Sequence, residues 1–297
     1  MFVADLHNDL VQRIIEGEDV TKATSHGHTD IPRLKESCIN LQILIIWVSS
    51  KTANPSYFDK ANKMYDEIEK LSSIKDVVIP KNLQEIKDGI KNNQLLLPIS
   101  MEGGEAIENK IDNLYYFIKR GLFYLGPTWN HSLDWVSSNY DEKYNKSKLK
   151  INGLNDFGKE VINICQENKV LIDVSHIGEQ SFWDIEKISQ KPFIASHSSV
   201  NKICSHFRNL NDDQIIAIKN KKGLIGINPY PFFIDPTFKE RESKIRNKYK
   251  EKIKSIEIQH STKSSQWLAK QHFFQKKLSG VCPDLEIFLD HMEYIIK

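Results

Sequence analysis

The sequence has few cysteines, and none of them form a motif. The 297-residue chain contains four, with no C-x-x-C arrangement among them: Cys38, Cys165, Cys204 and Cys282. Such scattered cysteines exclude a zinc ribbon and a thioredoxin motif and are typical of a protein kept in a reducing compartment. We therefore expect a cytoplasmic location.

Long apolar runs are also absent. The longest, residues 41–48, is interrupted by Gln42 and is far too short to span a bilayer. The first predicted strand begins at Phe2, which leaves no room for a signal peptide. We expect no membrane partner.

The chain has no strong excess of charge, with a formal net charge of +2. Residues 239–254 are the exception, because they hold eight Lys or Arg against three Glu. This segment is either a nucleic-acid patch or a solvated helix with Glu240–Lys244 and Glu242–Arg246 as i,i+4 pairs. No Gly-rich or aromatic interleaving accompanies it, so we favour the helix and expect no nucleic-acid partner.

Several catalytic motifs are missing. The chain has no G-x-S-x-G and no cysteine flanked by a plausible base. Residues 153–160 imitate a phosphate-binding loop but carry Glu160 where a magnesium ligand Ser or Thr is required. Four histidines have no strand-end context, so a structural or surface role is expected for them: His206, His260, His272 and His291.

Apolar β-type runs alternate with helical patterns along the chain. Seven strands are predicted, at Phe2–Leu6, Leu41–Val48, Leu95–Ser100, Leu122–Gly126, Val170–Val174, Phe193–Ser196 and Leu224–Asn228. Helices are predicted at Tyr57–Leu71, Ile111–Lys119, Gly158–Glu167, Gln180–Ser189, Asp212–Lys219 and, beyond the strands, Pro283–Lys297. Repeated βα units imply a parallel sheet. We expect an α/β fold of the (β/α)8 TIM-barrel type, in one incomplete domain over residues 1–297 that lacks strand eight.

Five residues lie where predicted strands give way to polar or glycine residues: His7, Asp9, Glu102, His176 and His197. Residues at the carboxyl ends of parallel barrel strands converge on one mouth. Three imidazoles and two carboxylates form a nitrogen and oxygen ligand set suited to zinc. Five ligands exceed one tetrahedral site, so the pattern indicates a metal pair bridged by a carboxylate.

The motifs resemble the renal (membrane) dipeptidase family of zinc metallopeptidases nearly end to end. They are D-L-H-N-D-L at 5–10, H-T-D-I-P-R-L at 28–34, M-E-G-G at 101–104, L-I-D-V-S-H at 171–176, K-P-F-I-A-S-H-S-S at 191–199, R-N-L at 208–210 and I-G-I-N at 225–228. The resemblance implies a barrel with two zinc ions that cleaves dipeptides, often with a D-residue at the C-terminal position.

The resemblance also assigns roles to residues. It implies one Zn²⁺ on His7, Asp9 and Glu102, a second on Glu102, His176 and His197, and Arg208 as the anchor of the substrate carboxylate. Two zinc ions about 3.5–4 Å apart share a hydroxide whose pKa is drawn towards roughly 7. Glu102 is the residue expected to bridge. A homodimer is what the family suggests.

The chain departs from the family at two places. Trp129 stands where the animal enzymes carry a substrate-contacting histidine, and His131 follows two residues later. The family's catalytic aspartate, in a G-x-D-F-D-G motif after strand eight, has no counterpart before Lys297, and neither do the C-terminal helices that follow it in the family. No catalytic residue is identified in this chain. Two functions stand: a zinc dipeptidase, or a non-catalytic or weakly active metal-binding relative.

Two carboxylates near the motifs have open roles. Asp173, three residues before His176, is either a partner of a ligand imidazole or an inward barrel residue in an ordinary hydrogen bond. Asp30, in the second His-x-Asp of the chain, is expected to cap a helix that begins at Ile31-Pro32.

Overall fold

The computed structural model describes residues 2–25, 27–48, 56–259, 266, 269–270, 273–274, 277–278 and 280–297. His260 and His272 lie outside the described residues. The chain divides into two compact units, described separately below: unit 1 is Met1–His197 with Asp213–Gly226, and unit 2 is Ser198–Asp212 with Ile227–Lys297. The single barrel domain over residues 1–297 stays a prediction.

Unit 1 contains the strands of the described residues. They are β1 (Ala4–Asn8), β2 (Leu41–Trp47), β3 (Val77–Val78), β4 (Leu95–Leu96), β5 (Ile99–Glu102), β6 (Leu122–Gly126), β7 (Leu171–Ile172), β8 (Ile194–Ala195) and β9 (Leu224–Ile225). Every pairing between them is parallel. The predicted parallel sheet is therefore confirmed.

The main ladder follows chain order. Strand β1 pairs with β2, β2 with β5, β5 with β6 and β6 with β7. A single parallel bridge between Asp173 and Ile194 leads to the pair β8–β9. This is the succession of neighbours that repeated βα units produce, and it gathers the carboxyl ends of the strands at one edge.

One predicted strand is two strands in the structure. Residues 95–100 form β4 and β5, separated at Leu97-Pro98, because proline has no N–H to donate to the ladder. Strand β5 then runs on to Glu102, beyond the predicted end. The two-residue strand β3, which pairs with β4, was not predicted because a ladder this short leaves no periodic signal.

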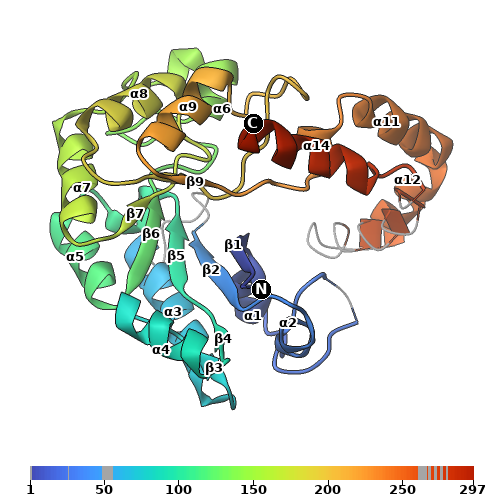
Figure 1. Ribbon diagram of the computed structural model, residues 1–297. Helices are drawn as coiled ribbons and strands as arrows, with labels where there is room; N and C mark the ends of the chain where they lie inside the picture. Colours follow the sequence, from blue (N-terminus) through green and yellow to red (C-terminus); the bar gives the residue numbers. More distant parts are fainter. Residues whose placement is uncertain are drawn as a thin grey trace. The chain divides into compact units, whose positions relative to one another are not determined.

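The helices fall close to their predicted ranges, and α5 coincides with its range. The helices of unit 1 are α1 (Leu10–Ile15), α2 (Ile31–Glu36), α3 (Tyr57–Glu69), α4 (Leu83–Lys91), α5 (Ile111–Lys119), α6 (Asn139–Tyr144), α7 (Asp156–Glu167), α8 (Glu179–Ile188) and, except for its first residue, α9 (Asp212–Asn220), with the 3-10 turns η1 (Lys70–Ser73), η2 (Gly104–Ile107) and η3 (Lys146–Lys148). Figure 1 shows α5, α7 and α8 following one another along the outer side of the strands.

The core of unit 1 lies between the strands and these helices. In β2, every residue from Leu41 to Ile46 is buried, Gln42 included, so both faces of the strand are covered, as expected for its mostly apolar sequence. Tyr124 of β6 is packed into the same cluster and is fully buried. Its ring is part of the core, and its hydroxyl reaches the carboxyl ends of the strands.

Unit 2 is helical, with α10 (Pro231–Ile234), α11 (Phe238–Lys248), α12 (Lys250–Gln259) and α14 (Leu285–Ile296). The basic segment is helical as predicted and contains the expected pairs Glu240–Lys244 and Glu242–Arg246. In α14, His291 is fully buried. Over the whole described part of the chain, the helices are too short or too polar to cross a membrane.

Candidate metal centre

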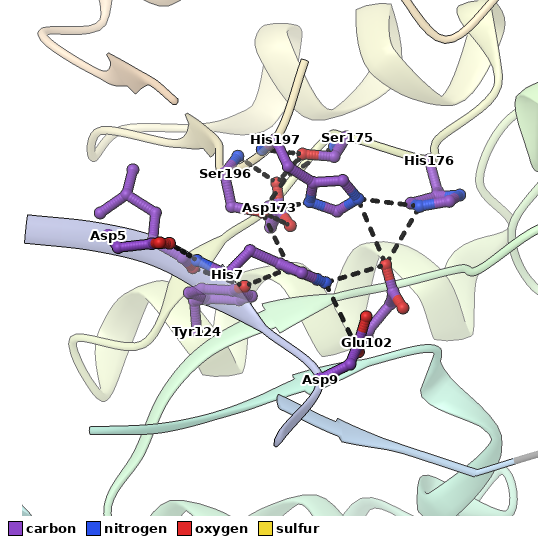
Figure 2. A network of polar contacts seen from close by, with 11 residues as sticks. Asp5, His7, Asp9, Glu102, Tyr124, Asp173, Ser175, His176, Ser196 and His197 are labelled. Carbon is purple, nitrogen blue, oxygen red and sulfur yellow. Dashed lines mark hydrogen bonds and ion pairs between the residues drawn. The ribbon is translucent and has the colours of Figure 1, made fainter. Parts of the chain in front are cut away.

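The five predicted ligands lie together in unit 1. His7 is in β1, Asp9 directly follows that strand, and Glu102 is the last residue of β5. His176 and His197 come after β7 and β8. Because the strands are parallel, their carboxyl ends share one edge, and Figure 2 shows the five side chains turned toward one another there.

The Glu102 carboxylate is the centre of the cluster. Its Oε1 atom lies 3.0 Å from His176 Nε2, 3.4 Å from His197 Nε2 and 3.7 Å from His7 Nε2. His7 Nε2 is also 3.9 Å from an Asp9 carboxylate oxygen. The side chains form two overlapping sets with metal-binding spacing, His7–Asp9–Glu102 and Glu102–His176–His197, and Glu102 belongs to both.

The backbone around two of these residues is shaped for the site. The β1–β2 ladder is irregular between Asp5 and Asn8, the stretch that contains His7, and irregular ladders redirect side chains beside functional sites. Gly103 has φ +90°, and a Cβ there would collide with the Glu105 carboxylate. Glycine is therefore required for the chain to turn immediately after Glu102.

A hydroxyl from the core fixes the ring of His7. Tyr124 Oη donates to the Leu6 carbonyl oxygen at 3.0 Å and lies 2.9 Å from His7 Nδ1. Burial raises the pKa of Tyr124 well above its ordinary value, so the hydroxyl keeps its single proton. We therefore interpret Nδ1 as the protonated nitrogen of His7, with the Nε2 lone pair facing Asp9 and Glu102.

The ring of His197 is held in the same way. Ser196 Oγ donates to Asp173 Oδ2 at 2.6 Å and lies 2.7 Å from His197 Nδ1. The serine proton is committed to the carboxylate, so Nδ1 donates to Ser196 and Nε2 carries the lone pair. That Nε2 atom lies 3.0 Å from His176 Nε2.

This donor arrangement fits metal ions. Two lone pairs that face a carboxylate oxygen repel it, and a cation between them removes the repulsion. Neutral imidazoles oriented through Nδ1 by hydrogen bonds are the form in which histidine binds zinc. A third set, His7–Asp173–His197, also has metal-binding spacing. Its carboxylate already accepts hydrogen bonds from the two serines, so we interpret this set as the support of the other two.

The H-T-D-I-P-R-L motif supports the segment that carries Asp9. Asn8 Nδ2 donates to Thr29 Oγ1 at 3.0 Å, and Asn8 Oδ1 accepts from the Leu10 main-chain nitrogen. Asp30 is fully buried and accepts from the Arg33 main-chain nitrogen at the start of α2. The helix-cap prediction for Asp30 is confirmed.

The loop after β6 braces His176 and carries two predicted substrate residues. Thr128 Oγ1 and the Asn139 main-chain nitrogen both donate to the His176 carbonyl oxygen. The Trp129 ring lies 6.4 Å from the His176 ring and 4.8 Å, edge-on, from Trp47. Trp129 therefore borders the metal centre.

The second predicted substrate residue of that loop, His131, is differently placed. Its Nδ1 atom lies 3.7 Å from an Asp141 oxygen, its ring contacts Tyr140, and 48% of its side chain is exposed. The aromatic contact between His131 and Trp129, with ring centres 6.1 Å apart, connects it to the border of the site.

Arg208, the predicted carboxylate anchor, belongs to unit 2. It is buried, with 3% of its surface exposed, and its guanidinium lies 5.6 Å from the centre of the Phe233 ring. Its main-chain nitrogen donates to His206 Nδ1. The guanidinium therefore lies in the interior of unit 2, beside an aromatic ring.

Three functional candidates escaped the sequence reasoning. Tyr124 and Ser196 contact candidate ligand histidines, and Glu105 follows the turn at Gly103. Burial raises the pKa of Glu105 to about 7, and the charge of Glu102 adds to the effect. Ser196 could have been found from the sequence, because it directly precedes the candidate ligand His197. Tyr124 could not have been found in this way, since it lies 117 positions from His7, the histidine that it contacts.

The sequence matches the family model described as membrane dipeptidase (peptidase family M19) over residues 1–297. An uncharacterised protein from the PQQ-III 3' region of Acinetobacter calcoaceticus is 31% identical over 251 residues, which cover 76% of this chain and 79% of that protein. Human dipeptidase 3 is 25% identical over 230 residues, covering 75% of this chain. The chain spans about half, 46%, of the human protein's length.

Solved structures show the same fold. The dipeptidase AC, a metallo peptidase of family M19, superposes with a TM-score of 0.70 and 25% identity over 79% of this chain and 73% of that one. A metallo peptidase from Rhodobacter sphaeroides, liganded with a phosphinate mimic of the dipeptide L-Ala-D-Ala, gives a TM-score of 0.69 at 23% identity, covering 80% of this chain and 76% of that one. The predicted α/β fold of the TIM-barrel metallohydrolase type is confirmed.

Proposed function

Because the chain belongs to the membrane dipeptidase family (peptidase family M19) and is therefore a metallo-dipeptidase, we propose that it hydrolyses the amide bond of free dipeptides, L-Xaa-D-Xaa among them. The observation that carries the proposal is the pair of ligand sets that share Glu102. A single buried carboxylate between two sets is the arrangement that a two-metal hydrolase requires.

We assign two Zn²⁺ ions to these sets. His7, Asp9 and Glu102 would hold one, and Glu102, His176 and His197 the other, with Glu102 as the bridge. Imidazole nitrogens and carboxylate oxygens are the ligands of catalytic zinc sites. When bound, the pair would supply a hydroxide nucleophile near neutral pH and polarise the scissile carbonyl.

The protein's own residues bind and orient the substrate. Trp129 and Trp47, both half-buried, offer apolar ring surfaces beside His176 against which a dipeptide side chain can pack. The Arg208 guanidinium would hold the terminal carboxylate through two parallel hydrogen bonds. Such an anchor selects short zwitterionic substrates over polymers, because a longer peptide places its carboxylate elsewhere.

The L-Xaa-D-Xaa preference is the finer part of the proposal. It is supported by the phosphinate mimic of L-Ala-D-Ala held by the Rhodobacter sphaeroides metallo peptidase, which shares the fold. The cytoplasmic location and the homodimer stay predictions.

The proposal is tested by a substrate panel. Purified protein, stripped of metal and reloaded with zinc, is assayed against L-Ala-L-Ala, L-Ala-D-Ala and the same dipeptides with an acetylated amine or an amidated carboxylate. We expect hydrolysis of the free dipeptides only, with the zinc-free protein inactive. The variant Glu102→Gln, purified in the same way, shows whether a contaminating peptidase contributes.

Two results would contradict the proposal. Equal turnover of carboxylate-blocked and free dipeptides would remove the role of the anchor. A zinc-loaded protein that binds dipeptides without cleaving any of them would be the non-catalytic relative.

A further inference from the structure

Three side chains behind the metal centre determine which nitrogen of two ligand histidines carries the proton. We propose that Tyr124, Ser196 and Asp173 are positioning residues. They keep His7 and His197 protonated on Nδ1, so that both Nε2 lone pairs face the shared carboxylate. This inference rests on the proposed metal-binding role of the histidines, but it concerns their state in the metal-free protein as well.

Asp173 acts on His197 through the hydroxyl of Ser196. It is 3% exposed, and its Oδ1 atom accepts from the Ser196 main-chain nitrogen at 2.8 Å, the Ser175 main-chain nitrogen at 3.1 Å and Ser175 Oγ at 2.6 Å. Its Oδ2 atom accepts from Ser196 Oγ. A carboxylate that receives four hydrogen bonds is acceptor-only, so the Ser196 proton cannot turn toward His197.

Tyr124 acts on His7 through a second hydroxyl, which lies 3.0 Å from the Leu6 carbonyl oxygen and 2.9 Å from His7 Nδ1. Ser196 touches both rings, because its Oγ atom also lies 3.4 Å from His7 Nδ1. Figure 2 shows Ser196, Asp173 and Tyr124 on the side of the imidazoles away from Glu102. The nearest hydroxyl therefore differs between the two histidines: Tyr124 for His7 and Ser196 for His197.

A substitution that keeps the shape of the Asp173 side chain distinguishes an effect on the histidine tautomer from an effect on packing. In Asp173→Asn, the amide oxygen must stay at the Oδ1 position, because two main-chain N–H groups and Ser175 Oγ donate there. The amide NH₂ then occupies the Oδ2 position and donates to Ser196 Oγ. The Ser196 proton is displaced toward His197 Nδ1, and the ring must carry its own proton on Nε2, the atom that binds metal.

The tautomers are read by ¹⁵N NMR of the histidine rings in metal-free protein above neutral pH. We expect Nδ1–H for His7 and His197 in the wild type. In Asp173→Asn, His197 should change to Nε2–H. In Tyr124→Phe, only His7 should lose its preference. Zinc titration against a competing chelator adds a second readout, and each variant should lose about 10- to 100-fold in affinity for one ion.

The matched control is Tyr65→Phe. Tyr65 is fully buried in α3, and its hydroxyl has no hydrogen-bond partner among the residues that the structure describes. This change should leave both tautomers and both zinc affinities unaltered. If Asp173→Asn does not fold, Ser196→Ala takes its place, and His197 should then populate both tautomers.

The proposal is overturned if either wild-type ring is protonated on Nε2. It also fails if the His197 tautomer is the same in Asp173→Asn, or in Ser196→Ala, as in the wild type. Because the NMR readout needs no metal and no substrate, it stands even if the protein proves not to be a zinc dipeptidase. Failure of the dipeptidase proposal is therefore distinguishable from failure of this one.

Discussion

Histidines with little exposed surface occur in both units, and they use their ring nitrogens differently. In unit 1, His7 and His197 are tethered through Nδ1, and their Nε2 atoms face Glu102. In unit 2, His291 Nδ1 accepts from the Val200 main-chain nitrogen at 3.0 Å, and its Nε2 donates to the Ile234 carbonyl oxygen at 3.0 Å. A ring whose two nitrogens both serve the main chain has nothing left for a ligand.

Burial alone does not separate the two kinds of histidine. His291 is 0% exposed and His176 is 9% exposed, so both count as interior residues. The partner of the Nε2 atom separates them. In His291, Nε2 donates its proton to a main-chain carbonyl oxygen and so has no lone pair for a cation, whereas the Nε2 atom of His176 faces the Glu102 carboxylate, with which it can share a cation. The structural role expected for His291 from its sequence context is confirmed.

The largest effect should come from Glu102→Ala, which removes the residue common to both ligand sets. We expect the loss of both ions and, because polarisation by metal contributes several kcal/mol, a fall in turnover of about 10³-fold or more. His176→Ala should empty mainly one site. Elemental analysis and dipeptide assays check this, and a Glu102→Ala protein that still holds two ions would rule out the bridge.

His291→Phe should act on stability and leave the metal content unchanged. The substitution leaves the Val200 N–H and the Ile234 carbonyl buried without their partner. We expect the free energy of unfolding to fall by about 2–5 kcal/mol, since each unsatisfied buried group costs about 1–3 kcal/mol. Chemical denaturation measures it. His291→Gln, whose amide can donate and accept, is the control and should lose less. If His291→Phe lost metal but kept its stability, His291 would not be a purely structural histidine, and the distinction between the two kinds of histidine would be wrong.

Arg208→Lys tests the carboxylate anchor that the resemblance to the family implies. Lysine keeps the charge but loses the bidentate fork, and a hydrogen bond to a charged group contributes about 1.5–3 kcal/mol. KM for free dipeptides should therefore rise about 10- to 100-fold with little change in kcat. Arg241→Lys, at the Asp235 ion pair of the same unit, is the control. An unchanged KM in Arg208→Lys would remove it from the substrate site.

The smallest effect concerns pH. Burial lowers the pKa of His291 below its ordinary 6.5, an effect partly opposed by the hydrogen bond to the Ile234 carbonyl oxygen and by the nearby charge of Asp290. Below pH 6.5, the His291 imidazole takes up a proton in the unfolded chain but stays neutral in the folded chain until the pH reaches the lowered pKa. The contribution of His291 to stability is therefore present above pH 6.5 and is lost as the pH falls from there toward the lowered pKa.

The variant His291→Gln removes this titration. In metal-free protein, the difference in unfolding free energy between wild type and His291→Gln should shrink as the pH falls from ~7.5 to ~5.5. Denaturant titrations at several pH values give that difference. If it is constant over the range, His291 is not held neutral by its burial.

Much of the candidate site was predictable because its signals are local. Each ligand directly ends an apolar strand or follows one closely, and parallel strands bring those ends together whatever the details of packing. The helix ranges were predictable for the same reason, since apolar periodicity lies within one segment. The split of residues 95–100 was missed although Pro98 was visible, because its effect depends on which neighbour each half pairs with.

The sequence by itself determined the fold type, the five residues that meet and the chemistry that their side chains offer. Only the tertiary structure decided how those side chains are oriented. The tautomer of His7 depends on a hydroxyl from Tyr124, and that of His197 on a carboxylate 24 positions earlier, reached through Ser196. A hydrogen bond acts over about 3 Å in space, whatever the separation along the chain, so its direction cannot be predicted from local pattern.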